Sequence, residues 1–471
     1  MNSNNRPKIG TFQLAMITVA YVASVRSMPT IAEYGFSCLF FYLIAALTFL
    51  VPSALVSAEL ATAWPERGGI YVWVKNALGQ RWGFLAIWLQ LLANIVGLPA
   101  LLSFLAATTA YIFMPSLAHN RYFLIGFILI VFWGSTFISF FGMKTAGWIN
   151  SIGATIGTLI PASIVIIMGA AWLIMGKPTQ IVMSWGTLIP DVHAMHLNDL
   201  VFLAGLMYGL TGMEVSGAHA LDVKDANKNY PKGIFLAVVL VLIVGFGSLS
   251  IAMVVPQHSL SLVAGVMQAF SAFFDYYHLP WMVPILATAI VIGLTGCLNS
   301  SVIGPSKGLF GTASGGDIPP FLAKLNKHGM PYNIFIAQAI VVSVISLVFL
   351  YMPSASSSYW LIMSVVSILY LLMYVLLFIS GIVARYKYPD VERTYKIPGK
   401  NIGMWIVSGL GLASTIFVTS LAFFPPNQLK VGNTTTYEIM LITGVLFFIG
   451  LGFLMFAMRK PSWVIEHKEV E

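Results

Sequence analysis

Residues 205–217 read GLMYGLTGMEVSG, an apolar segment that contains four glycines and one carboxylate, Glu214, near its middle. Within a helix, glycine costs about 1 kcal/mol relative to alanine, and a carboxylate at the centre of a bilayer costs about 2.5–3.5 kcal/mol. Interrupted helices occur at membrane depth only where neighbouring protein or a water-filled cavity satisfies the freed backbone groups. We therefore expect a broken helix here that lines such a cavity.

The composition predicts an all-α, multi-pass membrane protein. The chain has 471 residues, of which 58% are hydrophobic and only 8% are charged, whereas an ordinary soluble domain is about 25% charged. Cys38 and Cys297 both lie within apolar runs, so we expect no disulfide framework. The first ten residues, MNSNNRPKIG, do not lead into a signal-peptide cleavage site, so the first span should be retained.

Apolar stretches of about 20 residues, bounded by charges, prolines or turns, mark the expected membrane spans. We predict twelve of them, at residues 11–36, 38–63, 82–113, 121–141, 152–176, 197–220, 233–255, 280–304, 332–352, 359–384, 402–424 and 436–458.

Lysine and arginine are enriched in cytoplasmic loops, so their distribution predicts the orientation. With the N-terminus in the cytoplasm, 20 of the 24 lysines and arginines fall on the cytoplasmic side. The exceptions are Arg26, Arg121, Lys177 and Lys430. An even number of spans then places the C-terminus in the cytoplasm as well. This bias accounts for the net charge of +8, so the expected partner of the basic residues is the lipid bilayer and no nucleic acid is required.

A second interruption is predicted in the first span, where residues 18–36 read TVAYVASVRSMPTIAEYGF. Pro29 removes a backbone donor, and Arg26 and Glu33 place a charge on each side of it. The first and sixth spans are corresponding members of two five-helix units that enter the membrane from opposite sides. This pattern is typical of inverted-repeat transporters, which bind their substrate near the midplane.

We accordingly expect a ten-helix core over residues 1–385, with repeats at about 11–176 and 197–384. Two peripheral helices and a short tail follow in residues 386–471. Other classes of protein fit less well. The chain lacks a clustered nucleophile, base or metal-ligand set, a nucleotide motif and a filter-like pore segment, so we expect neither an enzyme nor a channel, and no cofactor.

Several short motifs resemble those of a known superfamily. This chain resembles the amino acid-polyamine-organocation transporters at Pro65–Tyr71 (PERGGIY), Gly79–Trp82, Gly212–Glu214 and Asn229–Pro231. Within that superfamily, three motifs are similar to the bacterial glutamate/GABA antiporters of acid resistance: Gly304–Gly308 (GPSKG), Leu325–Gly329 (LNKHG) and Lys396–Gly399 (KIPG). The likeness extends from about residue 10 to about residue 430.

This resemblance implies a LeuT-type fold, with ten core helices in two inverted repeats and two peripheral helices. It also implies exchange of amino acids, or of an amino acid for its decarboxylation product, by alternating access across a bacterial inner membrane. A proton-coupled symporter, or a transporter-derived sensor with little flux, stays open as an alternative. The expected assembly is a monomer or a homodimer.

The resemblance further implies that backbone amides of the broken first helix hold the substrate carboxylate, with help from the helix dipole. The residues at these positions are Tyr21, Val22, Ala23 and Ser24. Two interpretations of Arg26 stay open. Its guanidinium either pairs with a protein carboxylate such as Glu33, or binds an acidic group of the substrate directly.

Glu214 also has two interpretations. The carboxylate either stays neutral and stabilises the helix break, or takes up and releases a proton as the cavity opens and closes, because burial disfavours its charged form. The family likeness favours the gating role. Beside it, Tyr208 is a candidate aromatic gate, and Gly209 and Thr211 are candidates for the cavity wall.

Four further residues are candidates for the substrate pathway. Tyr370 and Tyr374 are four residues apart and share a helix face, and the corresponding tyrosines line the path in glutamate/GABA antiporters. Gln90 and Asn94 also share a face, and their amides either line the site or bond neighbouring helices.

Cys297 stands where glutamate/GABA antiporters carry a glutamate. The loss of that carboxylate, together with Arg26, makes the expected site more positive and favours anionic or neutral amino acids over cationic amines.

Overall fold

Ten long apolar helices account for most of the chain. The computed structural model describes residues 9–22, 25–64, 68–141, 153, 155–191, 193, 195–214, 223–311, 316 and 318–463. Among these residues, ten helices are long and apolar enough to cross a membrane. The prediction of an all-α, multi-pass membrane protein is confirmed.

The ten membrane-spanning helices agree with ten of the twelve predicted spans. They are Gly35–Ala63, which includes α3 (Cys38–Ala45) and α4 (Val51–Ala63), then α6 (Gln80–Phe113), α7 (Arg121–Ser139), Thr155–Ile174 with α9 (Ile160–Ile174), α13 (Ala226–Val254), α15 (Met282–Gly311), Tyr332–Tyr351 with α16 (Tyr332–Ser346), α18 (Ala355–Lys387), α19 (Lys400–Leu421) and α20 (Thr434–Ala457). Among the described residues of the two remaining predicted spans, the first and the sixth, no continuous helix has this length, and the count of twelve stays a prediction.

The first span is interrupted, as its sequence predicts. Helix α1 (Thr11–Val22) ends before a 3-10 turn at Val25–Ser27, and α2 (Met28–Ala32) begins directly after that turn. Pro29 occupies the first turn of α2, where a missing backbone N–H costs nothing. Proline therefore starts the second half of the span and does not kink a continuous helix.

The sixth span is interrupted within the glycine-rich segment. Helix α11 (Leu203–Gly209) contains only seven residues, and the chain leaves the helical conformation over residues 210–212. Gly212 has a φ of +111°, a backbone conformation that favours glycine. Residues 215–217, at the end of the quoted segment, lie outside the described residues.

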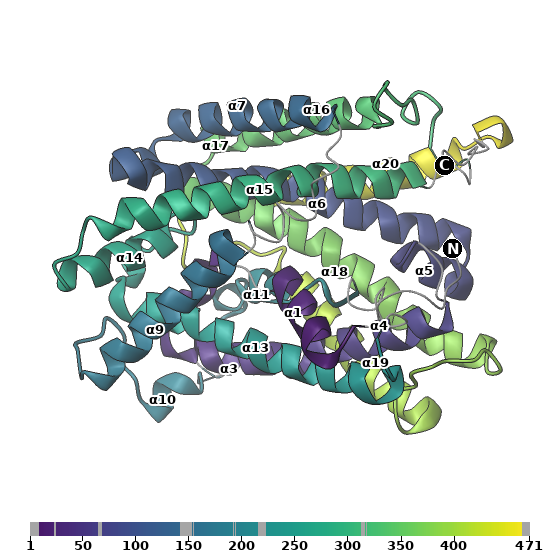
Figure 1. Ribbon diagram of the computed structural model, residues 1–471, viewed down its shortest axis with the longest axis horizontal. Helices are drawn as coiled ribbons and strands as arrows, with labels where there is room; N and C mark the ends of the chain where they lie inside the picture. Colours follow the sequence, from purple (N-terminus) through teal and green to yellow (C-terminus); the bar gives the residue numbers. More distant parts are fainter. Residues whose placement is uncertain are drawn as a thin grey trace.

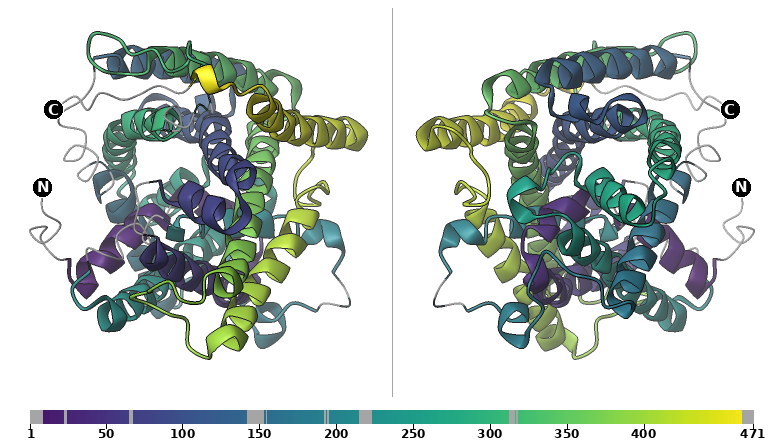
Figure 2. Two further views of the ribbon diagram at one scale, coloured as in Figure 1. Left: turned by 90° about the vertical axis from the view of Figure 1, so that its right-hand side faces the viewer. Right: turned by 90° about the vertical axis from the view of Figure 1, so that its left-hand side faces the viewer.

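The breaks of the first and sixth spans meet beside α18, the most buried helix. Figure 1 shows α11 near the centre, next to α18, and α11 packs against α18. Of the ten spans, α18 and α6 are the most buried, at 83% and 78%, whereas α20 is only 28% buried. Figure 2 shows α20 at the edge of the bundle. The peripheral role of the last two helices and the division into two inverted repeats stay predictions.

Short helices mark the two ends of the bundle. Helix α5 (Ile70–Leu78) and the connection between α18 and α19 lie at one end, and α10 (Trp185–Leu188) and α14 (Gly265–Tyr276) lie at the other (Figure 1). All the long helices run between these two ends. The predicted cytoplasmic loops at residues 75–81 and 385–400 therefore share one end.

Two glycines allow one unusually close helix crossing. A Cβ added to Gly293 of α15 would lie 2.5 Å from the Cα of Gly157, which belongs to the segment preceding α9. Real Cβ atoms do not approach backbone this closely, so only glycine fits at this crossing. Close backbone packing of this kind is a usual basis of helix association in membranes.

Gly293→Ala should therefore destabilise the protein. Overpacking of this kind costs about 1–3 kcal/mol, because the two backbones must separate. The measurement is thermal unfolding of the purified protein in detergent. The control is Gly304→Ala in the same helix, where an added Cβ has nothing within 4 Å and should be neutral or mildly stabilising. Equal unfolding temperatures for the two variants would contradict this account of the crossing.

Candidate functional site

A small cavity lies where the two interrupted spans meet. Its volume is about 80 Å³, well below the roughly 300–1,000 Å³ of most small-molecule sites. Three segments line it: the break in the first span, the break in the sixth span and the first half of α18. The lining residues are Val22, Arg26, Ser27, Tyr208, Gly209, Thr211, Tyr359 and Met363.

Glycine brings the two breaks together. A Cβ added to Gly209 would lie 3.3 Å from Oγ of Ser27, so a larger residue would require the Ser27 side chain to shift by a few tenths of an ångström. On the same turn, Thr211 Oγ1 donates a hydrogen bond to the carbonyl of Tyr208 at 2.7 Å. This bond satisfies a carbonyl group at the end of α11, where the regular helical pattern stops.

Arg26 is the one charged residue among those that line the cavity. The alternative that it pairs with Glu33 is wrong, because these two side chains form no ion pair. Among the described residues, no carboxylate pairs with the Arg26 guanidinium. Its backbone carbonyl accepts a hydrogen bond from Tyr359 Oη at 3.5 Å. The cavity wall thus carries one cation whose charge is not neutralised by a neighbouring described residue.

Glu214 is 4% exposed and accepts three hydrogen bonds from two other helices. Tyr370 Oη donates to Oε1 at 2.7 Å, and Tyr374 Oη donates to Oε2. From α6, Gln90 Nε2 donates to Oε1 at 3.0 Å. Tyr370 and Tyr374, which were predicted to share a helix face, therefore belong to a single cluster with Gln90 and Glu214.

Tyr208 connects this cluster to the cavity. Its ring packs edge-on against the ring of Tyr370, with 5.8 Å between the centroids. Tyr208 lines the cavity on one side, whereas Tyr370 bonds to Glu214 on the other. A movement of Glu214 would therefore be transmitted to the cavity wall through two aromatic rings in edge-on contact.

Of the other predicted site residues, some belong to the described part of the structure and some do not. Asn94 is not one of the residues that line the cavity, and its Nδ2 donates to the carbonyl of Gln90 at 2.8 Å. Val22 ends α1 and lines the cavity as predicted. Ala23 and Ser24 lie outside the described residues, as do the side chains of Tyr21 and Cys297, so the roles of these four stay predictions.

Two cavity residues, Tyr359 and Met363, were not expected from the sequence. They precede Tyr370 and Tyr374 on α18 at helical spacing, so all four share one face of the helix. Extending the pattern of the two tyrosines by three turns toward the start of α18 would have identified them. Among the described residues, no group of three or more histidine, cysteine or acidic side chains could hold a metal ion.

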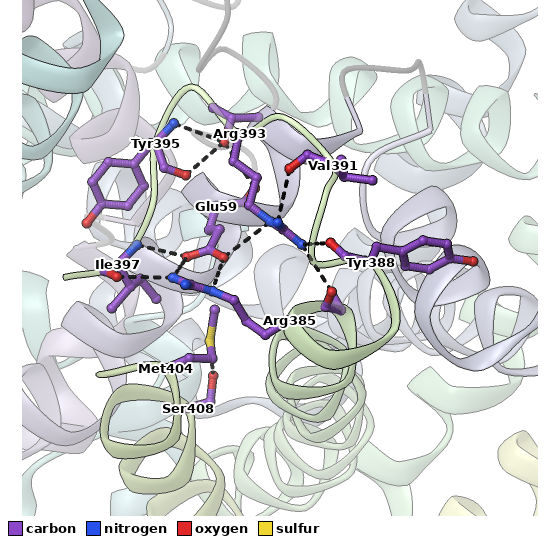
Figure 3. A network of polar contacts seen from close by, with 11 residues as sticks. Glu59, Arg385, Tyr388, Val391, Arg393, Tyr395, Ile397, Met404 and Ser408 are labelled. Carbon is purple, nitrogen blue, oxygen red and sulfur yellow. Dashed lines mark hydrogen bonds and ion pairs between the residues drawn. The ribbon is translucent and has the colours of Figure 1, made fainter. Parts of the chain in front are cut away.

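A second buried carboxylate, Glu59 of α4, lies at the other end of α18 (Figure 3). Its Oε1 is 2.5 Å from Arg385 Nε and 3.4 Å from Arg393 Nε. Its Oε2 accepts hydrogen bonds from Arg385 Nη2 at 2.7 Å and from the backbone N–H of Ile397 at 2.8 Å. One carboxylate thus joins α4, the end of α18 and the segment that leads to α19.

Arg393 also closes the C-terminal end of α18. Its Nη2 donates to the carbonyls of Ala384 at 3.0 Å and Tyr388 at 2.9 Å, at the end of the helix where carbonyl groups lose their regular helical partners. Burial lowers the pKa of the Arg393 guanidinium, and the neighbouring Glu59 carboxylate opposes this effect. The sequence offered a signal for this cluster, since Glu59 is an ionisable residue inside a predicted span.

Comparison with known proteins identifies similar sequences along nearly the whole chain. The family profile described as amino acid permease matches residues 9–447. An uncharacterized transporter of Legionella pneumophila is 39% identical over 453 residues, which cover 96% of this chain and 97% of that protein.

Two similar proteins of Lactococcus lactis have named substrates. A glutamate/gamma-aminobutyrate antiporter is 33% identical over 463 residues, which cover 97% of this chain and 91% of the relative. A probable agmatine/putrescine antiporter is 24% identical over 465 residues, which cover 96% and 95% of the two chains.

Glu59→Gln should strongly destabilise the protein. The change leaves two buried guanidinium groups next to each other without a carboxylate, and breaking a buried ion pair in this way costs about 3–5 kcal/mol. Thermal unfolding in detergent measures the loss. The matched control is Glu392→Gln in the same connecting segment, where the side chain is exposed and the expected change is within about 0.5 kcal/mol. An unfolding temperature of Glu59→Gln equal to that of the control would exclude a stabilising role for the cluster.

Proposed function

The chain belongs to the amino acid permease family, and we propose that it works as an antiporter that exchanges amino acids, or an amino acid for its decarboxylation product, by alternating access. The observation that carries this proposal is the cavity at the two helix breaks, joined through Tyr208 to the buried Glu214 cluster. The names of the Lactococcus lactis relatives support exchange over one-way transport. The proposed location is a bacterial inner membrane, with both termini in the cytoplasm.

The size of the cavity supports alternating access. A space of about 80 Å³ is too small for most amino acids, so binding requires the segments around it to separate. Each of these segments ends at a helix break or belongs to α18, and short half-helices can tilt without disturbing the long helices. We infer that the described arrangement is closed around the site, and that substrate enters when one of the three segments moves.

The charge of the cavity supports a substrate that carries a carboxylate. Arg26 offers a planar guanidinium that matches a carboxylate, and no acidic residue lines the cavity among those described. A cationic amine would meet repulsion there. We therefore propose anionic or neutral amino acids as substrates, bound near Arg26 and the backbone amides at the end of α1.

The Glu214 cluster supports a gate that responds to protons. Protonation of Glu214 would remove the charge that its three donors stabilise, and would free Tyr370 and Tyr374 to move with α18. Tyr208 would then change its position at the cavity wall. This mechanism assigns Glu214 to gating and leaves the choice of substrate to the cavity residues. A proton-coupled symporter would use the same residues, and the distinction depends on whether flux requires a second substrate on the opposite side.

Glu214→Gln should raise exchange at neutral pH toward its rate at acidic pH and flatten the pH dependence, because the neutral amide mimics the protonated carboxyl group. Without the charge, the hydrogen bonds from the tyrosines weaken, and a loss of about 1.4 kcal/mol corresponds to a tenfold change in rate. The measurement is uptake of labelled amino acid into proteoliposomes loaded with unlabelled amino acid, from acidic to neutral pH. Glu438→Gln on the peripheral helix α20 serves as the control. An unchanged rate and pH profile in Glu214→Gln would exclude the proposed gate, and equal uptake into empty vesicles would favour a symporter over an antiporter.

Small or acidic amino acids should raise the unfolding temperature of the purified protein. A ligand at about 100 times its Kd stabilises the folded state by about 2.7 kcal/mol. A thermal-shift screen with all amino acids and common polyamines provides the measurement. The effect of acidic amino acids should be lost in Arg26→Gln and retained in Arg121→Gln, an exposed arginine at the start of α7. Stabilisation by agmatine or putrescine alone would contradict the proposed substrate class.

A further inference from the structure

Gln90 is the third donor to Glu214, and it is not a member of the cavity wall. Its side-chain amide lies on α6, whereas the other two donors, Tyr370 and Tyr374, lie on α18. The Nε2 atom is 3.0 Å from Glu214 Oε1 and 3.5 Å from Tyr370 Oη. The carboxylate is thus held from two helices at once.

The directions of the hydrogen bonds indicate which form of Glu214 this arrangement fits. Tyr374 Oη accepts a hydrogen bond from the N–H of Gly212 at 2.9 Å, so its own proton is free to point toward Glu214. The NH₂ group of Gln90 can only donate. Both oxygens of Glu214 therefore act as acceptors, as in an ionised carboxylate.

Among the described residues, neutral groups supply this stabilisation. Within this part of the chain, the titratable groups that face Glu214 from the neighbouring helices are Tyr370 and Tyr374, and Tyr208 packs behind Tyr370. Arg26, the cation of the cavity wall, forms no ion pair with Glu214, and neither does any other lysine or arginine within the described ranges. On the remaining side, the ring of Phe49 packs against Tyr374 and offers no polar group. Each neutral donor therefore matters to the balance between the charged and protonated forms.

We propose that Gln90 is a positioning residue that holds Glu214 in its ionised form and thereby sets the pH at which the gate opens. The proposal rests on the proposed function, in which Glu214 is the proton-sensitive group of the gate. A hydrogen bond donated to a carboxylate favours the charged form, so it moves protonation to lower pH. Because α6 is a separate helix from α11 and α18, this bond exists only while the broken helix occupies the position described here. Gln90 thus couples the charge of Glu214 to the closed arrangement.

The test is an infrared pH titration of the purified protein, in which the C=O band of a protonated carboxyl group reports Glu214 directly. Loss of the band in Glu214→Gln assigns it. In Gln90→Met, which keeps the shape and removes the donor, we expect the midpoint of this band to rise by about one to two pH units, as a charge-assisted hydrogen bond predicts. The pH profile of exchange in proteoliposomes should move in the same direction.

The matched control makes the same substitution at a buried glutamine far from Glu214. Gln338 of α16 is 2% exposed and accepts a hydrogen bond from Ser306, so Gln338→Met should leave the Glu214 midpoint unchanged. If Gln90→Met fails to fold, Gln90→Leu provides a second donor-free variant. A midpoint that is unchanged in the Gln90 variants, or that moves equally in Gln338→Met, would overturn the proposal.

The two readouts separate this inference from the proposed function. If the wild-type protein exchanges no amino acid, the proposed function fails, while the infrared midpoint still reports the effect of Gln90 on Glu214. If exchange occurs and the midpoint does not depend on Gln90, the antiporter proposal stands and the role of Gln90 is wrong.

Discussion

The hydroxyl group of Tyr374 links the backbone of the interrupted sixth span to a buried carboxylate. It accepts a hydrogen bond from the N–H of Gly212, a group that the helix break leaves without its usual partner, and it donates to Glu214. Away from water, the N–H group would cost about 2–7 kcal/mol if it had no partner, and an ionised carboxylate would cost far more. One hydroxyl group thus bonds both to the backbone N–H freed by the helix break and to the buried carboxylate, and it stabilises the two together. The glycines of residues 205–217 allow the backbone to bend at this point.

Helix α18 carries the residues on which the rest of the site depends. Tyr359 borders the cavity in its first turns, Tyr374 contacts Glu214 near its middle, and Arg385 pairs with Glu59 in its last turn. Because α18 is the most buried of the ten spans, it is held firmly by packing along most of its length. The ion pair at one end, the Glu214 cluster in the middle and the cavity wall are thus connected by one helix. A displacement of this helix would alter all three.

The pattern of charges and glycines predicted the two interruptions correctly, because a charge, a proline or several glycines inside an apolar span conflict with a continuous helix. The same reasoning overlooked Glu59, although it is an ionisable residue within a span. It also could not determine the partner of Arg26: the sequence allowed an ion pair with Glu33, and the structure excludes it. For Gln90 and Asn94, one helix face was expected, yet only Gln90 reaches Glu214, whereas Asn94 bonds to its own helix.

The sequence by itself determined the class of the protein, ten of its membrane-spanning helices and the positions of both breaks. These features follow from local composition, because each segment must satisfy its own backbone within a bilayer. Only the tertiary structure decided which polar side chains meet. Glu214 and its donors Gln90 and Tyr374 are separated by more than a hundred residues, and their contact depends on how three helices pack. Helical spacing can place two residues on one face, but it does not determine which neighbouring helix that face contacts.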